Sequence, residues 1–203
     1  MTRNSNSFRI LGLVAAAIAF AAPVVAQPNF TRYVSVGDSL TAGFQSGGLL
    51  GTITRNSYPA LINRQAVGSD TNFLQPIVSA PGIPSVNQLV SLVGPVIAPP
   101  AGMGQLTNPL ITRPYNNVAV PGANVRDVLL TSTGGLHDLV LQQFSPALRG
   151  RTQLQQAVSL APTFVTIWIG NNDALAAATS GLVIDNVTLT TVDRFNTDYR
   201  AVV

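Results

Sequence analysis

A short apolar run, Tyr33 to Val36, breaks at Gly37 and delivers Asp38 and Ser39 into a turn. Valine and tyrosine favour β structure, and a continuous apolar run of this length predicts a buried strand of a parallel sheet. Ligands of open α/β sheets bind at the carboxyl ends of such strands. The segment therefore predicts an α/β fold with a nucleophile-bearing loop at one sheet edge, although Gly-Asp-Ser is also ordinary turn chemistry.

Two further segments repeat this arrangement of strand followed by a glycine loop. Asn117 to Val120 is a short β-favouring run before Pro121 and Gly122, and Thr163 to Ile169 is the clearest predicted buried strand, followed by Gly170, Asn171, Asn172 and Asp173. Parallel strands ending at one edge would bring Ser39, Gly122 and Asn172 together. Taken singly, Gly122 is explained by a turn, and the Asn-Asn-Asp cluster by the start of a helix.

Together the three segments resemble the GDSL, or SGNH, hydrolase family. The matching residues are Gly37, Asp38, Ser39, Leu40, Thr41 and Gly43 in the first motif, Asn117, Ala119 and Gly122 in the second, and Gly170, Asn172 and Asp173 in the third. The resemblance implies a three-layer α/β/α sandwich with a mainly parallel, flavodoxin-like sheet. It also implies an ester hydrolase that forms an acyl-enzyme on Ser39.

The resemblance assigns the remaining roles in the site. The Ser39 N–H, the Gly122 N–H and the Asn172 side chain would form the oxyanion hole, with Gly37, Asp38, Gly170 and Asp173 as supporting motif residues. Such a donor set stabilises the charge that develops on the carbonyl oxygen during acyl transfer. The substrate would be a small-molecule, lipid or glycan ester, and no cofactor is implied.

The sequence departs from the family at the catalytic base. The family takes its histidine and orienting acid from a late Asp-x-x-His motif, whereas His137 is the only histidine here and has Gly134 three residues before it. The helix expected from Thr191 also reaches Val203 without a stop signal, and about three core strands are predicted where the family has about five. We therefore expect a domain that is incomplete at the C-terminus and inactive alone.

Two alternatives remain open at this point. A catalytically dead relative could bind a glycan or lipid at the same cleft, or all three motifs could be turn chemistry in a secreted structural domain. An unorthodox base made of His137 and Asp138 is disfavoured, because adjacent residues on a helix point away from each other.

The amino terminus predicts a secretory signal peptide. Arg3 and Arg9 precede an uncharged run from Ile10 to Ala22, and small residues end at Ala26, where cleavage is expected. The apolar run is short for a membrane span of about 20 residues. We expect a secreted or periplasmic protein with no stable membrane span after cleavage, consisting of leader 1–26 and one domain, 27–203.

The composition of the chain also limits which partners and cofactors can be expected. The chain has 11 basic and 8 acidic residues, and loss of Arg3 and Arg9 with the leader leaves 9 against 8, so a nucleic-acid partner has no electrostatic support. The absence of cysteine excludes disulfides and thiolate zinc sites, and a single histidine disfavours a metal centre. Gly102 and Gly104 are only a fragment of a dinucleotide-binding motif. The oligomeric state stays open.

An uncharged, proline-rich insertion extends over about residues 71–112. Eight of the 14 prolines fall between Pro76 and Pro114, which predicts neither a regular helix nor a central strand. We expect the insertion to lie over the domain, either as a wall or lid for an acyl group or as an irregular loop packed on the core. Helices are predicted over residues 58–66, 123–130, 134–144, 152–160 and 174–178 and from 191, with a small β excursion at 179–190 and a Thr190–Asp193 capping box.

Overall fold

The centre of the fold is a small parallel sheet. The computed structural model describes residues 27–109 and 111–203, and in it β1 (Tyr33–Gly37) pairs in parallel with β4 (Phe164–Trp168), with Val34 opposite Val165. Residues 116–120 run along the other edge of β1, where Val118 N–H and Val120 N–H donate to the carbonyls of Ser35 and Gly37. β1 therefore lies in the middle of the three segments and is buried throughout.

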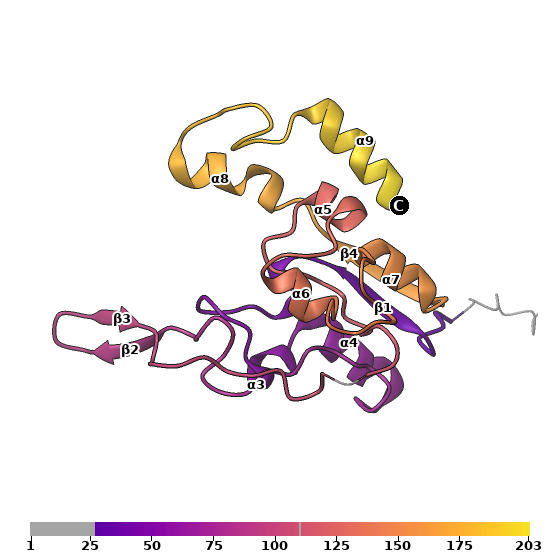
Figure 1. Cartoon of the computed structure of the whole chain (residues 1–203), viewed down its shortest axis with the longest axis horizontal. Helices are drawn as coiled ribbons and strands as arrows, with labels where there is room; N and C mark the ends of the chain where they lie inside the picture. Colours follow the sequence, from indigo (N-terminus) through magenta and orange to yellow (C-terminus); the bar gives the residue numbers. More distant parts are fainter. Residues whose placement is uncertain (1–26, 110) are drawn as a thin grey trace, which may run out of the picture.

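Helices contact both faces of β1, because successive side chains of a strand point to opposite faces and those of β1 are buried on both. Val34 and Val36 join a core cluster with α5 (Val125–Leu130) and α7 (Gln153–Ser159). Tyr33 packs with Phe73 and with Ala60 of α4 (Tyr58–Val67), and α4 and α7 lie on opposite sides of β1 (Figure 1). The chain is thus an α/β fold with helices and a small parallel sheet.

All six predicted helices are present, although three of them are shorter than predicted and two are longer. Besides α4, α5 and α7, the chain forms α6 (Leu136–Val140), α8 (Asn172–Ser180) and α9 (Val192–Val202). Capping boxes begin α5 at Asn124 and α7 at Thr152. Two short helices that were not predicted, α2 (Ser39–Ala42) and α3 (Gly51–Thr54), follow β1.

Two local predictions are wrong, and a third holds only in part. The β4 strand is only partly buried, with Trp168 50% exposed, because no strand among the described residues covers its outer edge. Helix α9 starts at Thr191 without a side-chain cap, so the Thr190–Asp193 box does not form. The small β excursion predicted at 179–190 is reduced to one β-bridge between Asp185 and Leu189, within a loop in which Thr188 Oγ1 accepts from Ile184 N–H and donates to the Leu182 carbonyl.

The insertion forms a hairpin that projects from the body instead of lying over it. Its strands are β2 (Gln88–Ser91) and β3 (Val96–Ala98), which extend away from the rest of the chain (Figure 1). The segments on either side of the hairpin do pack on the domain, with Phe73 and Val78 buried. The predicted signal peptide lies outside the described residues. None of the described helices is both long enough and apolar enough to cross a lipid bilayer.

Candidate functional site at the carboxyl end of the sheet

The turn after β1 depends on Gly37 and Asp38. A Cβ at Gly37 would overlap Thr41 Oγ1 and the Trp168 carbonyl oxygen and would lie 2.7 Å from Thr41 Cβ, so this close crossing requires glycine. Asp38 is fully buried and caps α2, accepting a 2.9 Å hydrogen bond from Leu40 N–H at Oδ1. Ser39 is thereby held, half-buried, in the first turn of α2.

The second motif is held beside this turn by backbone and side-chain bonds. Val120 N–H donates to the Gly37 carbonyl at 3.0 Å, and Asn117 Nδ2 donates to the Thr41 carbonyl at 2.9 Å. Gly122 is exposed and has a φ of 88°, a left-handed conformation that favours glycine. The loop after residues 116–120 therefore lies at the same sheet edge as Ser39.

The third motif bonds to both of the others. Asn171 Nδ2 donates to Asp38 Oδ2 at 2.8 Å, and Asn172 Nδ2 donates to the Ala123 carbonyl at 2.8 Å. Asp173 is buried and accepts from Val125 N–H at 2.9 Å, bracing the start of α5. Gly170 has a φ of 118° and lies against the Phe195 ring. All seven predicted site residues thus belong to one hydrogen-bonded cluster of loops.

Hydrogen-bond donors at this edge remain available to a ligand. Within residues 27–109 and 111–203, neither the Ser39 N–H nor the Gly122 N–H donates to a protein acceptor, and the Ser39 hydroxyl has no bonded partner. The Asn172 amide carries two hydrogens, so its bond to Ala123 leaves one donor. Since Ala123 follows Gly122 directly, that bond holds the Asn172 side chain next to the Gly122 loop.

His137 and Asp138 on α6 do not form an acid–base pair. The Asp138 carboxylate accepts from the Thr133 hydroxyl and from Gly134 N–H, and these bonds hold its pKa below the usual range. His137 Nε2 is buried without a hydrogen-bond partner among the described residues. No hydrogen bond within the described chain links His137 to Ser39.

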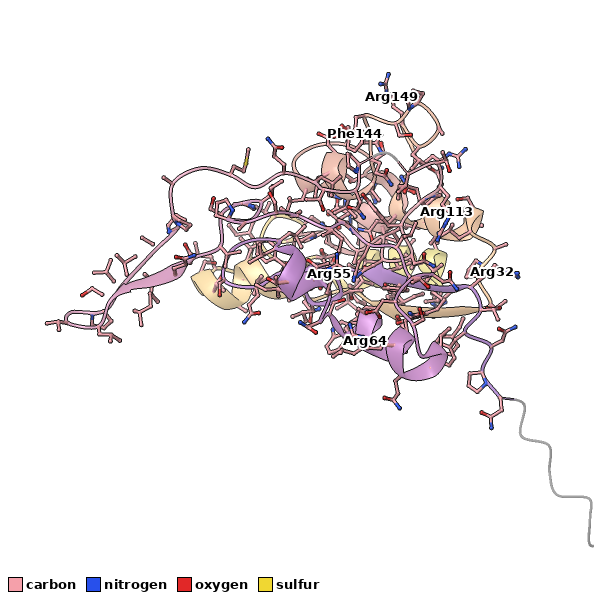
Figure 2. The ribbon with its side chains drawn as sticks, turned by 90° about the horizontal axis from the view of Figure 1, so that it is seen from below. Arg32, Arg55, Arg64, Arg113, Phe144 and Arg149 are labelled. Carbon is pink, nitrogen blue, oxygen red and sulfur yellow. The ribbon has the colours of Figure 1, made fainter. Side chains whose placement is uncertain are left out.

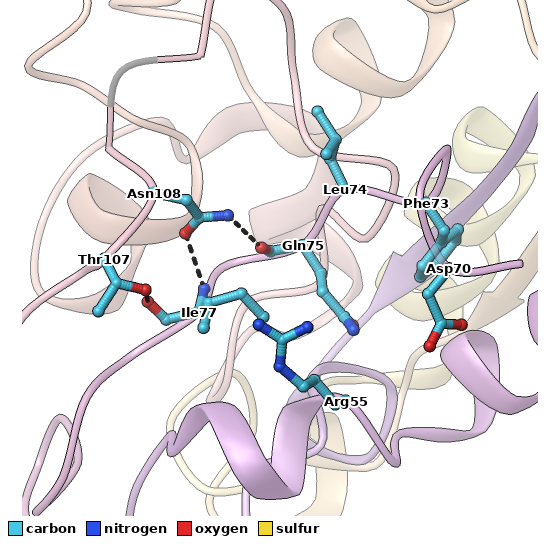
Figure 3. Close-up of a pocket in the computed structure, with 8 residues that line it drawn as sticks. All are labelled: Arg55, Asp70, Phe73, Leu74, Gln75, Ile77, Thr107 and Asn108. Carbon is cyan, nitrogen blue, oxygen red and sulfur yellow. Dashed lines mark hydrogen bonds between the residues drawn. The ribbon is translucent and has the colours of Figure 1, made fainter.

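One cavity lies beside α2, which carries Ser39, and another is lined by none of the motif residues. The one beside α2 has a volume of about 380 Å³ and is lined by Leu40, Gly43, Phe44, Gln45, Thr52, Ile53, Asn56, Ser57 and Tyr58. The other, about 360 Å³, is lined by Arg55, Asp70, Phe73, Leu74, Gln75, Ile77, Thr107 and Asn108 (Figure 3). Asn108 shapes the second cavity by bonding Ile77 N–H and the Gln75 carbonyl, and none of Ser39, Gly122 and Asn172 lines it.

Sequence reasoning missed two side chains of this site. Asn171 occupies the variable position of Gly-x-Asn-Asp, yet it supplies the partner of Asp38 Oδ2. Tyr58 contacts Trp168 at a ring-centroid separation of 5.5 Å and Thr41 Oγ1 at 3.2 Å, linking α4 to the ends of α2 and β4. Both carboxylate oxygens of a buried aspartate need a hydrogen-bond donor. That requirement is the one feature of the sequence that could have pointed to Asn171.

The fold and the site together define an α/β protein whose serine, glycine and asparagine loops meet at the carboxyl end of a parallel sheet. A family model described as GDSL-like Lipase/Acylhydrolase matches residues 33–203, and the chain belongs to that family. The family supports a hydrolase of lipase or esterase type, with small-molecule or lipid substrates. Searches of curated proteins and of solved structures gave no match.

Proposed function

We propose that this protein is a serine ester hydrolase in which Ser39 is the nucleophile. The Ser39 oxygen attacks the ester carbonyl, the alcohol leaves, and water then releases the acyl group from Ser39. The observation that carries the proposal is the meeting of the three motif loops around Ser39, with the N–H groups of Ser39 and Gly122 free of acceptors in the described chain.

The oxyanion hole in this proposal consists of the Ser39 N–H, the Gly122 N–H and the Asn172 amide. Gly37 and Asp38 position Ser39, while Gly170 and Asp173 hold the third loop. Asn172 is half-buried and Gly122 is exposed, so an ester carbonyl can reach both from solvent. Loss of one such donor commonly costs about 10² to 10³ in kcat.

The proposal also covers the cellular location and the domain organisation of the protein. It assigns residues 1–26 to a leader that is removed on export to the periplasm or the outside of the cell, and residues 27–203 to one domain of the α/β/α sandwich type. Packing against both faces of β1 supports the layered arrangement.

The chain lacks the catalytic base in the motif from which the family takes it. His137 is not part of an Asp-x-x-His motif, and its neighbour Asp138 is bonded to Thr133 and Gly134. We therefore propose that this 203-residue chain alone has little esterase activity. Without a base, a residual rate of about 10³ to 10⁴ over water is the serine-protease precedent.

A fluorophosphonate probe tests the nucleophile, because it reacts with activated serines and needs no knowledge of the substrate. We expect labelling of the protein in its active form at Ser39 and none in Ser39→Ala; labelling that survives Ser39→Ala would contradict the assignment. Hydrolysis of a p-nitrophenyl ester that is abolished by both Ser39→Ala and His137→Ala would show that His137 is the base after all.

The second candidate is a catalytically dead binder of glycan or lipid esters at the same edge, favoured by the missing Asp-x-x-His motif. A binder would hold an ester without turnover and would resist the probe. Equilibrium binding of a short ester to the wild-type protein, combined with no labelling of Ser39 under any condition, would favour this function.

A further inference from the structure

The β2–β3 hairpin exposes an unusual set of side chains for a water-soluble surface. Its tip residues Leu92 and Val93 are 83% and 93% exposed. The other large apolar residues of the hairpin, also at least half exposed, are Leu89, Val90, Val96 and Ile97. The surrounding sequence from Thr71 to Thr112 carries no charged residue. Contiguous exposed apolar surface of this kind marks an interaction site.

The apolar residues cover the whole hairpin rather than one side of it. Leu89 pairs with Ile97 across the strands, so their side chains share one face, while Val96, which precedes Ile97 in β3, points to the opposite face because side chains alternate along a strand. Leu92 and Val93 cover the end. A second copy or a protein groove that packed on one face would leave the other face in water, whereas a lipid phase can surround the tip.

Charge also favours a neutral surface over an anionic one. The labelled arginines, Arg32, Arg55, Arg64, Arg113 and Arg149, lie on the body of the protein and not along the hairpin (Figure 2). The hairpin therefore brings no cation to an anionic headgroup, and no charged group would have to lose its water when the tip enters an apolar phase.

We propose that the β2–β3 hairpin inserts its tip into the surface of a neutral, zwitterionic lipid layer. Insertion is shallow, because the outer edges of β2 and β3 carry backbone groups that need water or another partner. A four-residue strand spans about 13 Å, which is enough to place Leu92 and Val93 at the boundary of headgroups and acyl chains. This binding does not depend on Ser39 or on ester hydrolysis.

The absence of cysteine allows a local test on the full chain. Leu92→Cys would carry an environment-sensitive fluorophore, with Val187→Cys as the matched control, since Val187 is 74% exposed in the loop between α8 and α9. With phosphatidylcholine vesicles we expect the fluorescence at position 92 to rise severalfold and to be quenched by quencher-bearing acyl chains. The fluorescence at position 187 should stay unchanged.

Three outcomes would overturn the proposal. These are no change at position 92, an equal rise at both positions, or a rise at position 92 with protein concentration in the absence of vesicles, which would indicate pairing with a second copy.

As a second measurement, Leu92→Asp/Val93→Asp should weaken vesicle binding by about tenfold or more, because two apolar side chains are replaced by charges. Val187→Asp should not, and both variants should keep the wild-type circular dichroism because these side chains are exposed. Binding that requires anionic lipid, or that survives the double substitution, would also contradict the proposal.

Discussion

Asn171 donates a 2.8 Å hydrogen bond from Nδ2 to Oδ2 of Asp38, joining two loops that are 133 positions apart in the sequence. Asp38 is fully buried, and its other carboxylate oxygen accepts from Leu40 N–H. The two bonds satisfy a carboxylate that would otherwise be costly to bury. Asp38 thus fixes both the start of α2, which carries Ser39, and the loop that carries Asn172.

This bond predicts energetic coupling between the two loops. Asn171→Ala should lower the free energy of unfolding by about 1.5 to 3 kcal/mol, because it leaves one oxygen of a buried carboxylate without a donor. A double-mutant cycle with Asp38→Ala, measured by urea denaturation, should give a clear coupling energy. Strictly additive effects of the two substitutions would mean that the bond contributes nothing to stability.

A second prediction concerns the crossing at Gly37. Gly37→Ala should destabilise the protein by about 3 kcal/mol, because the new methyl group overlaps Thr41 and the Trp168 carbonyl within a tightly packed sheet edge. Gly68→Ala is the matched control: Gly68 has a φ of 73° but no atom near an added Cβ, so only about 1 to 2 kcal/mol of left-handed strain is expected. Thermal unfolding of both variants checks this, and a Gly37→Ala protein as stable as Gly68→Ala would contradict it.

The third prediction separates catalysis from capping at Asn172. In the catalytically active form of the protein, Asn172→Ala should reduce kcat by about 10² or more with little change in KM, since an oxyanion donor acts mainly in the transition state. Steady-state kinetics on a p-nitrophenyl ester and a thermal melt would be run on the same preparation. If kcat stayed within about threefold while stability fell, the bond to Ala123 would be the residue's whole role.

The fourth prediction concerns the attachment of α9. Val202 is 7% exposed and belongs to the main core cluster, whereas the adjacent Val203 is 73% exposed. Val202→Asp should therefore cost about 3 kcal/mol or more, because it buries an unpaired charge or detaches the helix. Val203→Asp should have almost no effect. Hydrogen exchange of the α9 amides checks the result, and similar protection in the two variants would show that Val202 does not anchor the helix.

The sequence predicted the parts of this fold that depend on local patterns. The Tyr33–Gly37 strand, the glycine loops after it and the helices near residues 58–66 and 152–160 follow from apolar periodicity, proline and capping chemistry. These features also predicted that Ser39, Gly122 and Asn172 would lie at one sheet edge. Their roles in catalysis stay predictions.

The errors arose where neighbours in space decide the structure. Thr163–Ile169 is apolar enough for a buried strand, but burial depends on what covers it, and the outer edge of β4 has no partner strand in the described chain. The Asn171–Asp38 bond joins residues that no local pattern connects. Composition showed that residues 71–112 are uncharged and proline-rich, yet it did not reveal that part of them projects as a hairpin.

The base of the hairpin is bonded to the chain that follows Ser39. Asn87 N–H donates to the Ser46 carbonyl at 2.8 Å, and Leu49 and Ile83 exchange two backbone bonds of 2.9 Å. From Ser46 back to α2, the chain is held by the Gln45–Gly48 pair and by Phe44 N–H, which donates to the Ser39 carbonyl. These hydrogen bonds connect the hairpin to Ser39 through a short stretch of chain. If both proposals hold, binding of the tip to a lipid layer would keep the Ser39 hydroxyl at a fixed height and orientation above that layer. The distance by which an ester protrudes from the layer would then decide whether it reaches Ser39.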